Sequence, residues 1–352
     1  MLRLTFASLV FAISAVAVAH VTRSSSTTST TGSFAVGSPF FNANERLAGD
    51  AAATTCIVVA LVLSAALYAL GVSRLWRAAA PGRGIRVQEV AMFCGGSGVL
   101  AFALLGPLDA WAAHSFSAHM LQHETLMLIA APLLVSGRPL AVWTWALPAL
   151  YRHRARAMIS APAWRATWRA ITGLAGATIV QLVALLVWHV PRFFDYASTH
   201  AAVHALQHAS FLASALCFWW AVRVPGLGRA EGASANSGVA IACLFLTMLG
   251  TGALGALLTF APAPWYHGYA GEGPRFAASA LEDQQLGGLL MWVPGSVVYL
   301  IAGLTHAWRL LARQPSPPSA RRPVLVDAAR SDPVSNAAAN TQRAIIEMRG
   351  GQ

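Results

Sequence analysis

The chain has 352 residues, of which 56% are hydrophobic and only 11% are charged. Its mean hydropathy of +0.56 excludes an ordinary soluble globular protein and indicates a membrane protein. The formal net charge is +11, and every basic residue is an arginine. Because most of these arginines lie in short stretches between apolar segments, they indicate membrane topology and disfavour nucleic-acid binding.

The two ends of the chain differ from its apolar middle. Residues 1–20 combine Arg3, an apolar run and an Ala-Val-Ala sequence, which predicts a signal peptide or an uncleaved signal anchor. A Ser/Thr-rich stretch over residues 21–50 predicts an outer linker, and the Pro/Ser/Ala-rich residues 311–352 predict a disordered cytoplasmic tail. A membrane domain is therefore expected over residues 51–310.

Seven segments of this domain are long and apolar enough to cross a bilayer, which takes about 20 helical residues. They predict an all-α polytopic bundle with spans near residues 52–73, 88–106, 115–135, 171–190, 199–222, 238–260 and 285–308. The stretch over 140–150 is apolar but short, and its two tryptophans predict a helix at the membrane interface. Glycines in the second and sixth spans predict close helix packing.

The arginines also predict the orientation of the spans. They are concentrated in the loops after the first, third and fifth spans and in the C-terminal tail. Arginines are retained on the cytoplasmic side of short loops. The sequence therefore predicts a mature N-terminus outside the cell and a C-terminus in the cytoplasm.

Histidines collect at the predicted outer ends of three spans. His119 and His123 are one helical turn apart in the third span, as are His204 and His208 in the fifth, and His189 ends the fourth. A spacing of four residues places both members of a pair on one helix face. Imidazoles at membrane depth need partners, so the pattern predicts a shared metal or haem site. His200 extends the ladder of the fifth span but lies at its exposed start.

Residue types narrow the choice of ligand. Imidazole suits copper, zinc, iron and nickel, and nearby methionines (Met120, Met127 and Met291) would favour cuprous copper. The four cysteines lack CxxC spacing, which disfavours a thiolate zinc site. Copper is the leading prediction and haem the alternative.

Two other interpretations of the histidines remain open. A metal-dependent enzyme would need a general base, for which Glu124 and Asp283 are the candidates. Alternatively, the histidines only join helices by hydrogen bonds, in which case they hold no metal. Metalloprotease, P-loop and nucleophile-elbow motifs are absent from the sequence.

Three sequence blocks within residues 50–310 are specific as a set. They are HMLQH at 119–123, running on to GRP at 137–139; WHVP at 188–191, followed by HxxxH at 204–208; and DQQLGG at 283–288. With these blocks the chain resembles the CtaG-type cytochrome c oxidase assembly factors associated with caa-type oxidases, a seven-span bacterial membrane family.

The resemblance implies a non-enzymatic assembly factor for a haem-copper cytochrome c oxidase in the bacterial cytoplasmic (inner) membrane. Its expected partners are oxidase subunits and the lipid bilayer. Its expected activity is to bind and deliver copper through histidines of the outer leaflet, and a haem-binding electron-transfer protein is the alternative. The metal-binding residues that it implies are His119, His123, His189, His204, His208 and Asp283.

Overall fold

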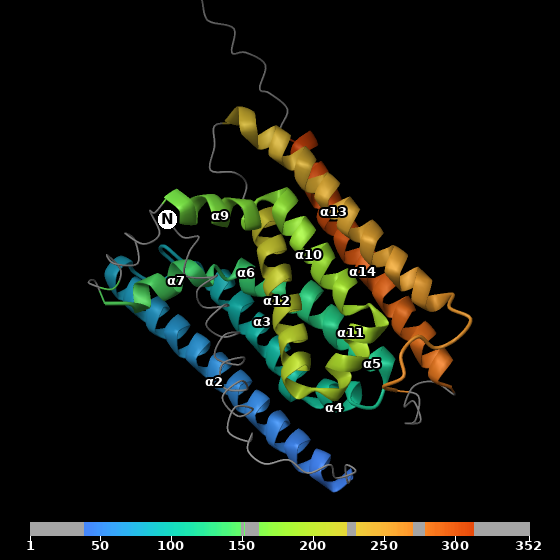
Figure 1. Cartoon of the computed structure of the whole chain (residues 1–352). Helices are drawn as coiled ribbons and strands as arrows, with labels where there is room; N and C mark the ends of the chain where they lie inside the picture. The colour runs from blue at the N-terminus through green and yellow to red at the C-terminus, as the bar shows by residue number, and fades with distance from the viewer. Residues whose placement is uncertain (1–38, 149–150, 152–161, 224–229, 270–278, 313–352) are drawn as a thin grey trace, which may run out of the picture. The chain divides into compact units, whose positions relative to one another are not determined.

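The computed structural model describes residues 39–148, 151, 162–223, 230–269 and 279–312 (Figure 1). Within these ranges every regular element is a helix, which confirms the predicted all-α class. The predicted signal peptide over residues 1–20 and the tail beyond residue 312 lie outside the described residues. Residues 39–50 of the predicted linker belong to the first described helix, which begins at Pro39.

Seven apolar segments form the long helices of the bundle. Their bounds are α2 Pro39–Ala79, α3 Val87–Leu105, α5 Phe116–Glu124 continuing through the π-helix η1 Thr125–Ala130 into α6 Ala131–Ser136, α10 Leu174–Trp188, α12 Ala201–Arg223, α13 Ala230–Thr259 and α14 Ala280–Leu311. Shorter helices lie between them: α4 Pro107–Ala112, α7 Pro139–Ala146, α9 Pro162–Thr172 and α11 Pro191–Thr199.

By length and composition the described chain is a polytopic membrane protein. Five helices are long and apolar enough to cross a membrane by themselves, and the number rises to seven if each of two bent helix pairs counts as one span. One pair joins the third predicted span to α7 with a bend of 54°, and the other joins α9 to α10 with a bend of 68°. The stretch predicted to form a short helix over residues 140–150 forms α7, which ends at Ala146.

The bend before α7 is built by the GRP sequence. Gly137 packs so closely on Phe93 that a Cβ atom there would lie 2.5 Å from the Phe93 Cβ. Arg138 adopts a left-handed conformation with φ of 51°, and Pro139 then occupies the first turn of α7, where its missing N–H costs nothing. The Tyr68 hydroxyl donates to the Gly137 carbonyl at 2.7 Å, which fixes the corner against α2.

Helices α13 and α14 run side by side and approach closely at two glycines (Figure 1). A Cβ atom on Gly288 would lie 2.6 Å from the Gly255 carbonyl oxygen, so any larger residue would push the backbones apart. This contact confirms the predicted packing role for the sixth span. In the second span only Gly96 makes such a contact, against the Leu134 backbone, while Gly95 and Gly98 face open space.

Helix α12 packs against α10, α11, η1 and α6, and it therefore positions its histidines among the other histidine-bearing segments. Its C-terminal half is held by Trp219, whose indole N–H donates to the Met127 carbonyl at 2.8 Å. In a π-helix the backbone carbonyls do not follow the regular α-helical i→i−4 hydrogen-bonding pattern. The Trp219 indole provides a hydrogen-bond donor for the Met127 carbonyl. The same indole stacks on Tyr299 of α14, with ring centroids 5.9 Å apart.

Candidate metal centre

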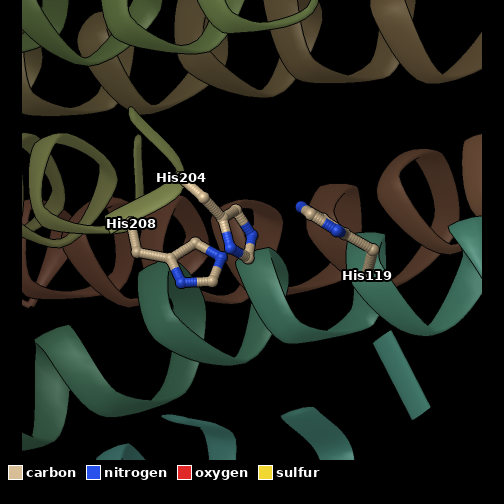
Figure 2. A group of neighbouring side chains, drawn as sticks. All are labelled: His119, His204 and His208. Atoms are coloured by element: carbon tan, nitrogen blue, oxygen red, sulfur yellow. The ribbon is translucent and has the colours of Figure 1, made fainter. Parts of the chain in front are cut away.

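Three histidines from two facing helices converge. His119 projects from α5, and His204 and His208 project from successive turns of α12 (Figure 2). One ring nitrogen from each residue lies within 4.8 Å of the others. Nitrogens bound to one metal ion at about 2.0–2.1 Å are at most about 4.2 Å apart, so small side-chain movements would bring this trio into a coordination shell. His119 and His208 are buried, and His204 is partly exposed.

The other two predicted ligands, His123 and His189, border the trio without belonging to it. The Nε2 atoms of His119 and His123 are 3.0 Å apart. The ring centroids of His123 and His208 are 5.1 Å apart, while those of His123 and His189 are 6.4 Å apart. The structure thus brings the five histidines predicted from sequence into one cluster, in which all but His204 are buried, and three of them are close enough to share an ion.

The hydrogen bonds of His119 define which of its nitrogens can bind a metal. The Tyr269 hydroxyl donates to the Ala112 carbonyl at 3.1 Å and also lies 2.7 Å from His119 Nδ1. Burial, reinforced by the Asp283 carboxylate, raises the pKa of Tyr269, so this hydroxyl keeps its proton. Because that single proton is donated to Ala112, His119 donates its Nδ1–H to Tyr269, and its Nε2 atom is left as the acceptor of the hydrogen bond with His123 Nε2. A metal ion bound at His119 Nε2 would replace that hydrogen bond.

His189 is oriented by the same kind of bond. Its Nδ1 lies 2.7 Å from the Leu185 carbonyl, an acceptor, so Nδ1 carries the proton and Nε2 has a free lone pair. That Nε2 atom is buried and makes no hydrogen bond. The His189 carbonyl accepts a bond from Tyr266 at 3.0 Å, and Pro191 begins α11 two residues later. The WHVP sequence therefore orients one imidazole at the junction of two helices.

Asp283, the sixth predicted ligand, has a different set of contacts. Its carboxylate, 2% exposed, accepts bonds from Phe116 N at 2.6 Å, Ser115 Oγ at 2.9 Å and Ser117 Oγ at 2.5 Å, with Ser117 N at 3.3 Å. The four donors belong to Ser115, the N-cap residue of α5, and to the first two residues of the helix. Asp283 thus clamps α14 to the N-terminus of the helix that carries His119, where a negative charge also complements the helix dipole. It is not a member of the convergent trio.

The loop before α14 covers the cluster with aromatic rings. Phe194 of α11 packs on Tyr266 with centroids 4.3 Å apart and on His119 at 5.4 Å. The loop is tied to α11 by Asp195, which accepts from the His267 backbone N–H at 3.1 Å. These contacts contribute to the burial of His119, which is 3% exposed.

The three other histidines that were predicted on the outer side lie apart from the cluster. His114 is exposed, with Nδ1 3.1 Å from the Ala110 carbonyl. His200 is also exposed, and its ring stacks on Tyr196 with centroids 4.0 Å apart. His267 pairs with Asp195 at 3.3 Å.

The other side chains considered as ligands or bases face neighbouring helices. Glu124 lies against α14, where a Cβ atom on Gly295 would be 3.1 Å from its Oε2 atom. The Met127 sulfur accepts a bond from Gln181 at 3.3 Å, and Met120 packs next to Gly287. The contacts of both methionines are those of packing residues.

Comparison with protein families adds a decisive observation. The model of the cytochrome c oxidase caa3 assembly factor family (Caa3_CtaG) matches residues 66–313, which is most of the chain. The chain belongs to this family. Comparisons with curated proteins and with solved structures gave no match. The matched region contains all five clustered histidines, Asp283 and Tyr269, so the resemblance inferred from the sequence blocks is confirmed.

As a member of this family, the chain is a cytochrome c oxidase assembly factor. Such a protein acts with oxidase subunits or on their assembly. The sequence patterns did not predict that Tyr269 contributes to the candidate centre. It lies in an irregular loop about 150 positions after the histidine that it orients, and periodicity gives no information on such pairs. Only its position among aromatic residues between the last two spans distinguishes it.

Replacing Tyr269 with phenylalanine tests the assignment of the His119 proton. The change removes only the hydroxyl that accepts from Nδ1, so His119 loses its preference for presenting Nε2. We expect cuprous affinity to fall by about tenfold, the lower range for loss of such a supporting bond. Competition with a chromophoric cuprous chelator measures this affinity. Tyr196→Phe on the exposed face of α11 is the matched control, and equal affinities for the two variants would refute the assignment.

Proposed function

We propose that this assembly factor binds copper at His119, His204 and His208 and delivers it to a subunit of the oxidase within the membrane. His123 and His189 complete the cluster as neighbouring donors. The observation that carries the proposal is the convergence of three imidazole nitrogens within 4.8 Å in a largely buried position. Imidazoles without thiolates hold copper loosely enough for release, which delivery requires.

Haem fits the same atoms less well. Two axial imidazoles can face each other across a porphyrin, but the third nitrogen of the trio, also within 4.8 Å of both, would overlap the plane of the macrocycle. A single metal ion does not need space for a macrocycle between the nitrogens. Purified protein loaded with copper and lacking a Soret band is the expected result, whereas stoichiometric haem would support electron transfer instead.

We further propose that the histidine centre lies at the outer face of the bacterial inner membrane and that the chain catalyses no reaction. The arginine-rich loops support this orientation. The direction of Glu124 supports a non-enzymatic role, since a general base would have to reach a reactant at the metal and this carboxylate lies against α14.

A deletion strain grown under copper limitation tests the function. We expect the oxidase polypeptides to be present while oxidase copper content and activity fall at least about fivefold. A wild-type copy should restore both, and a copy with His204→Ala and His208→Ala should not. Unchanged oxidase activity in the deletion strain at limiting copper would refute copper delivery, and added copper should rescue the strain if the proposal holds.

A further inference from the structure

Basic side chains gather at the ends of α12 and α14 that lie opposite the histidine centre. Both helices begin beside that centre, because His204 lies in the first turn of α12 and Asp283, in the first turn of α14, binds the start of α5. The two helices therefore run in the same direction away from the histidines. Their last turns carry Arg223 and Arg309, respectively.

Aromatic stacking holds α12 and α14 together just before these basic residues. The Trp219 and Tyr299 rings stack with centroids 5.9 Å apart and an interplanar angle of 7°. Arg223 follows Trp219 by one helical turn and His306 follows Tyr299 by two turns, so both lie on the faces that meet at the stack. At a rise of 1.5 Å per residue they are about 6 Å and about 10 Å beyond it. Arg309 lies one further turn along α14.

The three basic side chains are close enough to act on one another. The Arg223 and Arg309 guanidinium groups repel each other, and both act on the His306 imidazole. Within the described ranges no carboxylate forms an ion pair with any of the three. Like charges held near one another by packed helices lower stability unless a counter-ion neutralises them. An anion bound between the two helix ends would remove this repulsion.

The neighbouring residues of α14 indicate the source of this anion. Leu304 is 60% exposed, and Trp308 and Leu311 are both 72% exposed. In a membrane-spanning helix, exposed leucines contact acyl chains, and tryptophan is typical of the level of the lipid headgroups. An anion at this level is best supplied by the phosphate of a lipid whose acyl chains cover the exposed leucines. Basic sites between the cytoplasmic ends of helices bind such headgroups.

We propose that Arg223, His306 and Arg309 bind the phosphate group of an anionic phospholipid between α12 and α14. Each guanidinium group can donate paired hydrogen bonds to phosphate oxygens, and the imidazole adds a further donor. The lipid links α12, which carries two histidines of the trio, to α14, which clamps the start of α5. The site requires no copper, so it can be tested independently of the proposed copper function.

Native mass spectrometry of the detergent-purified protein, titrated with phosphatidylglycerol, tests the site. Arg223→Gln with Arg309→Gln should weaken phosphatidylglycerol binding at least about tenfold, the effect of losing one charge-assisted hydrogen bond. Arg77→Gln with Arg83→Gln is the matched control, because it removes the same charge from two exposed positions at and after the end of α2. The control should bind the lipid as the wild type does, and equal affinities for the two double variants would overturn the proposal.

Thermal unfolding in detergent without lipid tests the repulsion between the arginines. The variant with Arg223→Gln and Arg309→Gln should unfold at a temperature no lower than that of the wild type, because the like charges are gone. A lower midpoint would show that the arginines stabilise the helix ends without an anion, and the proposal would be wrong.

The same measurement with added ligands identifies the anion. Phosphatidylglycerol should raise the midpoint of the wild type and of the control but not that of the Arg223/Arg309 variant. Phosphatidylcholine and inorganic phosphate should raise none of them. Equal stabilisation of the wild type by inorganic phosphate would assign the site to a free anion and overturn the lipid proposal. Equal stabilisation by phosphatidylcholine would show that the site does not select negative charge, which would also overturn it.

Discussion

The double substitution His204→Ala and His208→Ala is expected to abolish copper binding. It removes two of the three nitrogens that converge on one position, and it leaves His119 with one neighbouring donor on its own helix. Alanine preserves the helical backbone of α12, so the protein should still be recovered from membranes. After cuprous loading and removal of free metal, elemental analysis should give about one copper per wild-type chain and less than about a tenth of this in the variant.

The matched control uses histidines outside the cluster. His114 and His200 are exposed and bond to backbone carbonyls of their own segments. Alanine at both positions should leave the copper content unchanged. If the His204/His208 variant kept its copper while losing stability, the histidines would act as links between helices, and the copper proposal would be abandoned.

Replacement of Asp283 by alanine should have the largest effect on the fold. The carboxylate accepts four bonds at the start of α5, two of them from backbone N–H groups that no helical carbonyl can satisfy. Loss of a buried charged acceptor with several donors is expected to lower the free energy of unfolding by about 3 kcal/mol. Thermal unfolding in detergent measures this as a lower midpoint, and the copper affinity should fall because His119 lies in the freed helix.

Glu282→Ala provides the control for Asp283. Its side chain is exposed on the preceding residue of the same helical turn. A surface change of this kind should alter the free energy of unfolding by no more than about 0.5 kcal/mol. Unchanged stability of Asp283→Ala together with complete loss of copper would identify Asp283 as a direct ligand, as the sequence analysis predicted.

The sequence predicts the existence of the long helices because span length follows from bilayer thickness, although α2 begins at Pro39 and α13 at Ala230, before the predicted spans at 52 and 238. The predicted spans over 88–106 and 199–222 differ from α3 and α12 by at most two residues at either end. The spacing of four residues likewise predicts correctly that His204 and His208 lie on one face, and that Glu124 points away from His123. These features depend only on local helix geometry.

Contacts between distant segments could not be predicted in the same way. Asp283 lies in the first turn of α14, and the family resemblance implies that its carboxylate binds the metal. It instead reaches α5, 166 to 168 positions away. The break between α9 and α10 at Gly173 and the orientation of His119 by Tyr269 also depend on tertiary packing. Periodicity carries no information on such choices.

The π-helix in the third span has a consequence for how this chain can vary. Each α-helical residue turns the helix by about 100°, and a π-helical turn contains about one residue more than an α-helical turn. Residues 125–130 therefore offset the face carrying His119 and His123 from the face that packs on α3 below it. The number of residues between His123 and the GRP sequence therefore fixes how the histidines are rotated relative to the bend before α7. Substitutions within this stretch leave the rotation between the two faces unchanged, whereas an insertion or deletion of one residue would rotate the turns that carry His119 and His123 away from α12.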